Sequence, residues 1–142
     1  MKITLRDLFE ARMIIEPKAC ALAVRRADDD EIEEILRLGE IVQKNSKQNP
    51  RGSARIESEI AFHGALLRAS HNDFIEQFIP LLTQTIEKTF AIDENLEIIA
   101  EDAYKDHIVI MDSLRHRDAE AIESAVFIHL RHAAWNEDLT MA

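Results

Sequence analysis

Glycine and proline are scarce in this sequence, with three of each among 142 residues. Because these two residues provide most tight turns, the backbone has few places at which it can reverse abruptly. Alanine, leucine, isoleucine, glutamate and arginine, most of which favour helices, dominate the remainder. The composition therefore predicts an all-α protein.

Cysteine is limited to Cys20, which excludes an internal disulfide. This residue lies in the apolar stretch 19–24, so we expect a buried thiol in a reducing compartment. The N-terminus lacks the apolar segment of a signal peptide, and no apolar run approaches the length needed to cross a bilayer. We predict a cytoplasmic protein with no membrane partner.

Basic residues are outnumbered, with 17 lysines and arginines against 27 acidic residues and a formal net charge of −10. Such a surface repels a phosphate backbone unless its bases are strongly clustered, and the basic run 115–117 is too short for that. We do not expect this chain alone to bind DNA. Its hydrophobic content of 46 % is enough for one continuous core, which predicts a single domain over residues 1–142.

Apolar residues recur with a helical period in six stretches, separated by short polar segments. Thr4 is the predicted N-cap of the first stretch, and the acidic run 28–31 predicts the start of the second. The remaining stretches start near Ile56, Asp73, Leu96 and Ala119. Short connections between long helices favour a single antiparallel bundle of about six to seven helices.

Two prolines fall inside predicted helices, and two polar segments are predicted to lie between helices. Pro17 is expected to kink the first helix or to break it near Met13, and Pro80 is expected to kink the helix that starts at Asp73. Residues 44–53 are predicted to form a connection, and residues 93–95 a turn.

Three of the six histidines occupy positions where the helical period requires an inward-facing apolar residue: His63, His107 and His129. Each taken alone fits a buried histidine whose nitrogens are satisfied by a neighbouring hydroxyl or carbonyl. Three imidazoles from three helices in one apolar bundle are costly unless a common partner satisfies them. A divalent metal ion is such a partner.

Glu59 lies four residues before His63, so both side chains share one helix face and can reach a common ion. One carboxylate and three imidazoles suit Zn²⁺, Ni²⁺, Mn²⁺ or Fe²⁺, and the order of affinities does not choose among them. The alternative for Glu59 is a solvated acid on a helix face. The other histidines are left outside this site, because His71 and His116 fall at helix ends and His132 lies off the stripe of His129.

Several short segments occur in a specific order and spacing along nearly the whole chain. They are Leu5-Arg6-Asp7-Leu8-Phe9-Glu10-Ala11-Arg12 with Ile15-Glu16-Pro17, Phe62-His63-x-x-Leu66 leading to Ala69-Ser70-His71-Asn72, then His107, Arg117-Asp118-Ala119-Glu120-Ala121 and His129-Leu130. In this order they resemble the FCD domain, the C-terminal ligand-binding domain of the FadR subfamily of GntR-type transcription regulators.

The resemblance implies metal ligands at Glu59, His63, His107 and His129, with open coordination positions for a small carboxylate effector or water. The family usually has aspartate where this chain has Glu59, and the longer side chain can shift the ion or loosen its binding. Arg12 matches the arginine of the family's opening motif and is predicted to pair with an effector carboxylate. The alternative for Arg12 is an i,i+4 salt bridge to Glu16.

Regulators of this family also carry an N-terminal winged helix-turn-helix domain, and the segment before Leu5 is too short to contain one. We therefore expect either a fragment or a stand-alone sensor, with DNA contacted only through that absent domain in a homodimer. The resulting hypothesis is metal-dependent sensing of a small organic acid by the effector-binding domain of a transcription regulator, and not an enzyme.

Two other functions remain open from the residues alone. A metal-dependent enzyme, a hydrolase or isomerase, can be built on the same ligands, with Glu57, Glu101 or Asp102 as a possible general base. A dimerisation bundle without any ligand is the third reading.

Overall fold

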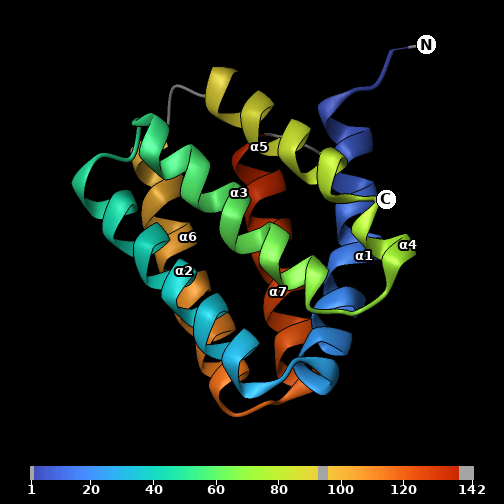
Figure 1. Ribbon diagram of the computed structural model, residues 1–142. Helices are drawn as coiled ribbons and strands as arrows, with labels where there is room; N and C mark the ends of the chain where they lie inside the picture. Colours follow the sequence, from blue (N-terminus) through green and yellow to red (C-terminus); the bar gives the residue numbers. More distant parts are fainter. Residues whose placement is uncertain (1, 93–95, 138–142) are drawn as a thin grey trace.

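The computed structural model describes residues 2–92 and 96–137, and within them every regular element is a helix (Figure 1). The helices are α1 (Leu5–Arg26), α2 (Asp29–Gln48), α3 (Ser53–Arg68), α4 (Asp73–Glu76), α5 (Ile79–Ile92), α6 (Leu96–Arg115) and α7 (Ala119–Asn136). This confirms the predicted all-α class. None of these helices is long and apolar enough to span a membrane.

The long helices form a closed ring. Helix α7 packs between α1 and α6, α2 packs between α6 and α3, and α3 contacts α1 to complete the ring. Helix α5 lies across α1 and α3 at one end of the bundle (Figure 1). The ring encloses one continuous apolar core, with Phe62, Ile110 and Leu114 among its largest fully buried members.

A second, smaller apolar cluster lies under α5 and consists of Ala19, Leu67, Leu82 and Ile86. Cys20 is buried in the main core, as predicted, and burial raises the pKa of its thiol. Where α2 crosses its neighbours, Gly39 leaves no room for a side chain, because an added Cβ would lie 2.9 Å from the Met111 sulfur. Helix α2 therefore approaches α6 closely at this position.

The helix starts follow the capping residues of the sequence. The Thr4 hydroxyl accepts a hydrogen bond from the Asp7 amide, and the Asp7 carboxylate accepts one from the Thr4 amide, both at 3.1 Å. Asp28 and Glu31 form the same reciprocal arrangement at the start of α2. Both predicted helix starts are confirmed, and each capping box satisfies backbone amides that have no partner within the helix.

Pro80 lies differently from the prediction, whereas the kink expected at Pro17 stays a prediction. Helix α1 runs unbroken through Pro17, so the break considered near Met13 does not occur. Pro80 lies in the first turn of α5 rather than inside the helix that starts at Asp73, which ends at Glu76. The predicted single kinked helix is therefore wrong, since a new helix starts just before Pro80. A proline in the first turn fits this position because the amide it lacks has no partner within the helix.

The predicted connection at 44–53 is also wrong in extent, since α2 continues to Gln48 and only residues 49–52 join it to α3. Gln43 and Ser46 take the buried positions of this last part of α2. Because both are polar, the inward stripe of α2 is not visible in the hydrophobic pattern. The turn predicted at 93–95 lies outside the described residues.

The turn between α6 and α7 lies at the end of the bundle away from α5 (Figure 1). Arg117 connects this turn to the junction between α1 and α2. It lies in the turn between α6 and α7, and its guanidinium donates to the carbonyls of Val24 and Ala27 at 3.2 and 2.7 Å. It also donates to the Asp29 carboxylate at 2.7 Å. The carbonyls at the end of α1 thereby gain a charged donor.

Replacing this guanidinium with a methyl group is expected to destabilise the fold. We expect Arg117→Ala to lower the free energy of unfolding by about 1–2 kcal/mol, because charge-assisted hydrogen bonds contribute more than neutral ones, although this side chain is partly solvated. Arg115→Ala is the matched control, since Arg115 makes only exposed ion pairs and its loss should cost less than about 0.5 kcal/mol. Urea unfolding followed by circular dichroism measures both, and equal effects would contradict the role of Arg117.

Candidate metal centre

Three histidines from three helices meet in the interior. His63 comes from α3, His107 from α6 and His129 from α7, with exposed fractions of 4 %, 0 % and 9 %. One ring nitrogen of each lies within 4.8 Å of the corresponding atoms of the other two. Among the histidine, cysteine, aspartate and glutamate side chains of the described residues, these three histidines form the group that is close enough to share an ion.

The rings are held by packing as well as by backbone position. The His63 and His129 rings are parallel with centroids 5.7 Å apart, and the His107 ring lies 4.9 Å from that of His129. Phe62, which is fully buried, presents its ring edge-to-face to both His63 and His107. This aromatic wall separates the imidazoles from the apolar core and restricts their rotation.

Glu59 is buried next to two of these histidines, so the alternative of a solvated helix-face acid is wrong. One carboxylate oxygen lies 3.3 Å from His63 Nε2 and 3.8 Å from His107 Nε2. Its other oxygen lies 3.6 Å from Arg55 Nε. The carboxylate is not within the 4.8 Å group of the three histidines, so it touches the cluster from one side.

Arg55 is a site residue that the sequence reasoning missed. It is 1 % exposed, it lies four residues before Glu59, and its guanidinium stacks 4.6 Å from the centre of the Phe90 ring. The series Arg55, Glu59 and His63 places a charged or polar side chain on the same helix face at every fourth position. This four-residue spacing is the signal in the sequence from which Arg55 could have been found.

The protonation states suit a cation. Burial removes water from His107 and lowers its pKa to about 3, and the neighbouring Glu59 carboxylate offsets only part of this decrease. The imidazole is therefore neutral at physiological pH. Burial alone would raise the pKa of Glu59, but its imidazole neighbours and Arg55 hold that pKa below its usual value. The site therefore offers the neutral imidazole of His107 beside the ionised carboxylate of Glu59.

His107 gives the strongest indication that a ligand is needed. Both of its ring nitrogens are buried and neither has a hydrogen-bond partner in the described part of the chain. A neutral imidazole carries one N–H donor and one lone pair, and leaving such groups unsatisfied in an apolar interior costs about 1–3 kcal/mol each. A divalent ion fits the donor set, since it would take the lone pair of each of the three imidazoles.

Asp106 and His132 extend the cluster beyond the predicted residues. Asp106 lies on α6 next to His107, and its carboxylate is 3.1 Å from His129 Nδ1 and 3.0 Å from His132 Nδ1. Burial opposes ionisation of Asp106, but these two histidines hold the pKa of its carboxyl below the usual value. The helical period gave no signal for this contact, because it depends on how α6 and α7 are rotated against each other.

Arg12 lies in the alternative arrangement considered for it, a buried salt bridge with Glu16. Its Nε and Nη2 atoms donate to the two Glu16 oxygens at 2.5 and 3.1 Å. Arg12 nevertheless lines the same cavity as the histidine cluster. The predicted effector contact therefore requires an arginine that already has one carboxylate partner.

The cavity beside the cluster has a volume of about 60 Å³. Its lining comes from α1, α3, α5, α6 and α7 and includes Phe9, Arg12, Arg55, Glu59, His63, Ile86, Thr89, Phe90, Ala103, His129 and Ala133. A few water molecules fill such a volume, whereas pockets for organic ligands usually exceed about 300 Å³. Accommodating an acid of several carbons requires some of these side chains to move.

The remaining histidines and the candidate bases lie elsewhere. His71 pairs with Glu31 at 2.8 Å and His116 approaches the Asp112 carbonyl at 2.8 Å, both at helix ends as predicted. Glu57 is exposed, and Asp102 accepts a hydrogen bond from Asn136.

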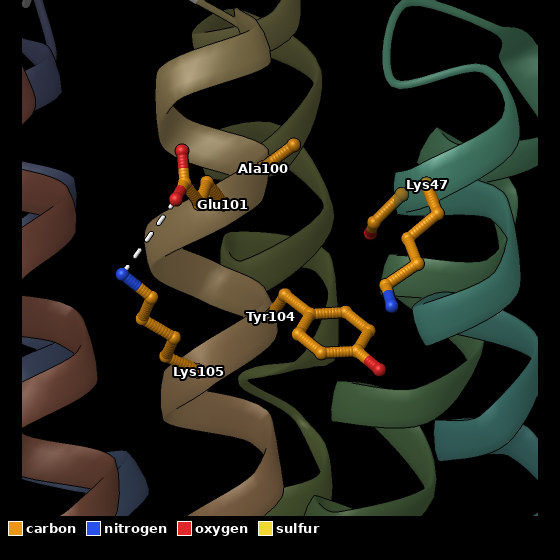
Figure 2. Close-up of a pocket in the computed structure, with 6 residues that line it drawn as sticks. Lys47, Ala100, Glu101, Tyr104 and Lys105 are labelled. Atoms are coloured by element: carbon orange, nitrogen blue, oxygen red, sulfur yellow. Dashed lines mark ion pairs between the residues drawn. The ribbon is translucent and has the colours of Figure 1, made fainter.

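Figure 2 shows the third candidate base, Glu101, paired with Lys105 at 3.6 Å beside a separate cavity of about 340 Å³. Lys47 lies over the Tyr104 ring on the other side of this cavity. Neither Glu101 nor the other two acids lines the cavity of the histidine cluster. No described acid other than Glu59 therefore faces that cavity in the position of a general base.

Comparison with known proteins identifies the relatives of this chain. The family model described as the FCD domain matches residues 7–132. The chain is 29 % identical over 122 residues to the galactonate operon transcriptional repressor of Escherichia coli K12, covering 82 % of this chain and 50 % of that protein. It is 28 % identical over 131 residues to the HTH-type transcriptional repressor NanR of Salmonella newport, covering 89 % and 49 %.

Solved structures share the fold. A Streptococcus agalactiae GntR protein superposes with a TM-score of 0.76 at 21 % identity, over 94 % of this chain and 58 % of that one. The E. coli protein McbR/YncC gives 0.74 at 17 % identity, over 93 % and 63 %. The chain thus spans about half the length of the curated relatives it matches. Those relatives are transcriptional repressors rather than enzymes, in line with the expectation of a non-enzymatic domain.

The unsatisfied nitrogens of His107 lead to a stability prediction for the metal-free protein. His107→Leu replaces the imidazole with an apolar side chain of similar size, so in the presence of a chelator we expect the free energy of unfolding to rise by about 1–3 kcal/mol. His116→Leu, at an exposed histidine, should change it little. Urea unfolding in EDTA measures both variants, and a loss of stability in His107→Leu would contradict unsatisfied burial.

The same variant should alter how the free energy of unfolding of the metal-free protein depends on pH. The unfolded chain binds a proton at His107 below its ordinary pKa of about 6.5, whereas the folded protein does so only near pH 3. This difference makes stability fall as the pH falls through that window, and His107→Leu should remove that part of the loss.

Proposed function

Since the chain belongs to the FCD domain family, we propose that it is the effector-sensing domain of a cytoplasmic GntR-type transcription regulator, and that it responds to a small organic acid through a bound divalent metal ion. The observation that carries this proposal is the meeting of three buried imidazoles from α3, α6 and α7. DNA contact is assigned to a separate DNA-binding domain of the regulator, because this chain carries a net charge of −10 and spans half the length of its repressor relatives.

The proposed metal ligands are His63, His107 and His129, with Glu59 as the carboxylate on one side. Nitrogen and oxygen donors without thiolate suit zinc, nickel, manganese or iron(II). The bound ion would supply a Lewis-acidic centre with coordination positions open to oxygen ligands. Phe62 packs against the His63 and His107 rings, and no hydrogen bond from the described residues occupies the His107 nitrogens, which leaves a lone pair for the ion.

The charges around the cavity favour an anionic effector. Arg12 is neutralised by Glu16, and Arg55 by Glu59, so these two pairs sum to zero, and the Asp106 carboxylate beside His129 adds one negative charge. A divalent ion added to this site leaves an uncompensated positive charge in a buried environment, where an anion that enters is attracted strongly. A small carboxylate matches this charge, and Arg12 and Arg55 both line the cavity in which it would bind.

The small volume of the cavity suggests how binding is transmitted. Ile86, Thr89 and Phe90 of α5 form part of its wall, and α5 rests on the smaller apolar cluster rather than on the main core. We propose that the acid displaces α5 outward, which changes the outline of the domain. A tenfold change in operator occupancy requires a difference of only about 1.4 kcal/mol between the two arrangements.

The expected test is binding of metal and acid without turnover. After chelation, the protein should take up one divalent ion per chain, and a metal-bound acid should raise the melting temperature only when the ion is present. His63→Ala and His129→Ala should abolish uptake, whereas the controls His71→Ala and His116→Ala should retain it. Titrations followed by elemental analysis and calorimetry measure this for a panel of sugar acids and hydroxy acids.

Two results would overturn the sensing proposal. One is a wild-type protein that binds none of the four metals, which would favour a ligand-free bundle. The other is chemical conversion of an acid by the metal-loaded protein, which would favour an enzyme.

We also propose that the domain forms a homodimer through the face made by α1 and α7. A groove of about 500 Å³ runs along this face, and Ile14, Phe127 and Ile128 are exposed beside it. Its charged groups, Lys18, Glu123 and Arg131, carry almost balanced charge.

The groove between α2 and α3 is of similar size but is lined by Asp28, Asp30, Glu31 and Glu34 against Arg68. Two acidic α2–α3 grooves would repel one another, and the net charge of −10 on each chain adds to this repulsion. The α1 and α7 faces of two copies have nearly balanced charge and can meet across a twofold axis. Charge therefore selects the α1 and α7 face for a second copy.

Introducing charge on this face should separate the dimer. We expect Ile14→Glu and Phe127→Glu to raise the dimer dissociation constant more than tenfold, because each buries a carboxylate in an apolar contact. Phe74→Glu, at an exposed phenylalanine of α4, is the control and should leave it unchanged. Sedimentation velocity over a range of concentrations measures this, and a monomeric wild-type protein would contradict the proposed dimer.

A further inference from the structure

Asp106 is the carboxylate that faces the outer side of the histidine cluster. It lies on α6, and one of its oxygens is 3.1 Å from Nδ1 of His129 on α7. The same oxygen lies 3.0 Å from Nδ1 of His132, so the carboxylate is placed as a hydrogen-bond acceptor between two imidazoles. An ionised carboxylate only accepts hydrogen bonds, so the His129 nitrogen that faces it must carry the proton.

This contact fixes the state of His129. With the proton held on Nδ1, the lone pair of the imidazole is on Nε2, for which no carboxylate partner is found in the described part of the chain. A neutral histidine in water carries its proton on either nitrogen, and only one of the two forms can bind a metal through Nε2. Asp106 selects this form before any ion arrives.

His132 holds the carboxylate in turn. Its Nδ1 lies 3.1 and 3.0 Å from the two Asp106 oxygens, and its side chain is partly exposed at the edge of the cluster. The position of His132 is three residues after His129 on α7, so both rings reach α6 from neighbouring turns. Asp106 is thereby held between two imidazoles, and its rotation is restricted.

We propose that Asp106 is a positioning residue of the metal centre, which orients His129 and fixes its tautomer, and that His132 supports Asp106 in this position. The inference rests on the proposed metal site, to which it adds residues that the four predicted ligands do not include. Carboxylates that accept a hydrogen bond from a metal-bound histidine typically change metal affinity 10- to 100-fold.

The experiment uses Zn²⁺ as the probe, in competition with a chromophoric chelator. Asp106→Ala should weaken zinc binding about 10- to 100-fold. Asp106→Asn should have a smaller effect, because its amide oxygen can still accept the proton of Nδ1, and His132→Ala should fall between the wild type and Asp106→Ala. Asp102→Asn is the matched control, since Asp102 lies one turn earlier on α6 and accepts a hydrogen bond from Asn136.

A second readout separates positioning from general destabilisation. Long-range ¹H–¹⁵N correlation spectra of the metal-free protein, recorded in the presence of a chelator, should show His129 protonated on Nδ1 in the wild type and in Asp102→Asn. In Asp106→Ala the ring should shift toward protonation on Nε2. Circular dichroism establishes that each variant is folded, and Asp106→Asn replaces the alanine variant if that one unfolds.

The outcomes distinguish the two proposals. Wild-type protein that binds no zinc would overturn the metal site and the role of Asp106 with it. Wild-type protein that binds zinc, with Asp106→Ala no weaker than Asp102→Asn or with His129 protonated on Nε2, would overturn the positioning role alone.

Discussion

The fold encloses three imidazoles in an apolar interior, where each ring nitrogen needs a hydrogen-bond or metal partner. The side chains around the cluster are arranged around this requirement. Burial keeps His107 neutral, and neither of its nitrogens has a hydrogen-bond partner within residues 2–92 and 96–137. Glu59 faces the cluster from α3, and Asp106 faces it from α6 on the other side. The two carboxylates supply negative charge at the edges, while the centre keeps the lone pairs that a cation requires.

The ring of helices is what makes this meeting possible. The three histidines come from α3, α6 and α7. Helices α6 and α7 are consecutive in the chain, and the ring brings α3 beside them through its contacts with α1 and α2. Arg117 secures one end of the ring, and α5 covers the other. The end that Arg117 stabilises by charged hydrogen bonds is thus separate from the α5 end, which would have to move when an effector binds.

The sequence was sufficient for features that depend on local rules. The all-α class, the caps at Thr4 and Asp28 and the inward position of the histidines follow from composition, side-chain chemistry and the helical period. The errors at Pro80 and in residues 44–53 arose where the hydrophobic pattern is silent. A proline fits a helix start as well as a kink, and the polar residues Gln43 and Ser46 hide the inward face of α2.

The residues missed at the site required tertiary information of different kinds. Arg55 was detectable, since it continues the four-residue spacing of Glu59 and His63. Asp106 was not, because its contact with His129 depends on the rotation of α6 against α7. The size of the cavity was also beyond the sequence, as it is set by side chains from five helices at once.

The single cysteine of the chain gives the fold a built-in reporter. Cys20 lies one turn after Glu16, the partner of Arg12, and both its burial and its raised thiol pKa keep it unreactive in the closed bundle. Alkylation of this thiol therefore requires an opening of the bundle that exposes Cys20, and its rate depends on how often that opening occurs. Any ligand that tightens the cavity around Arg12 slows that separation, and the labelling rate records its binding without a substituted residue or an attached dye.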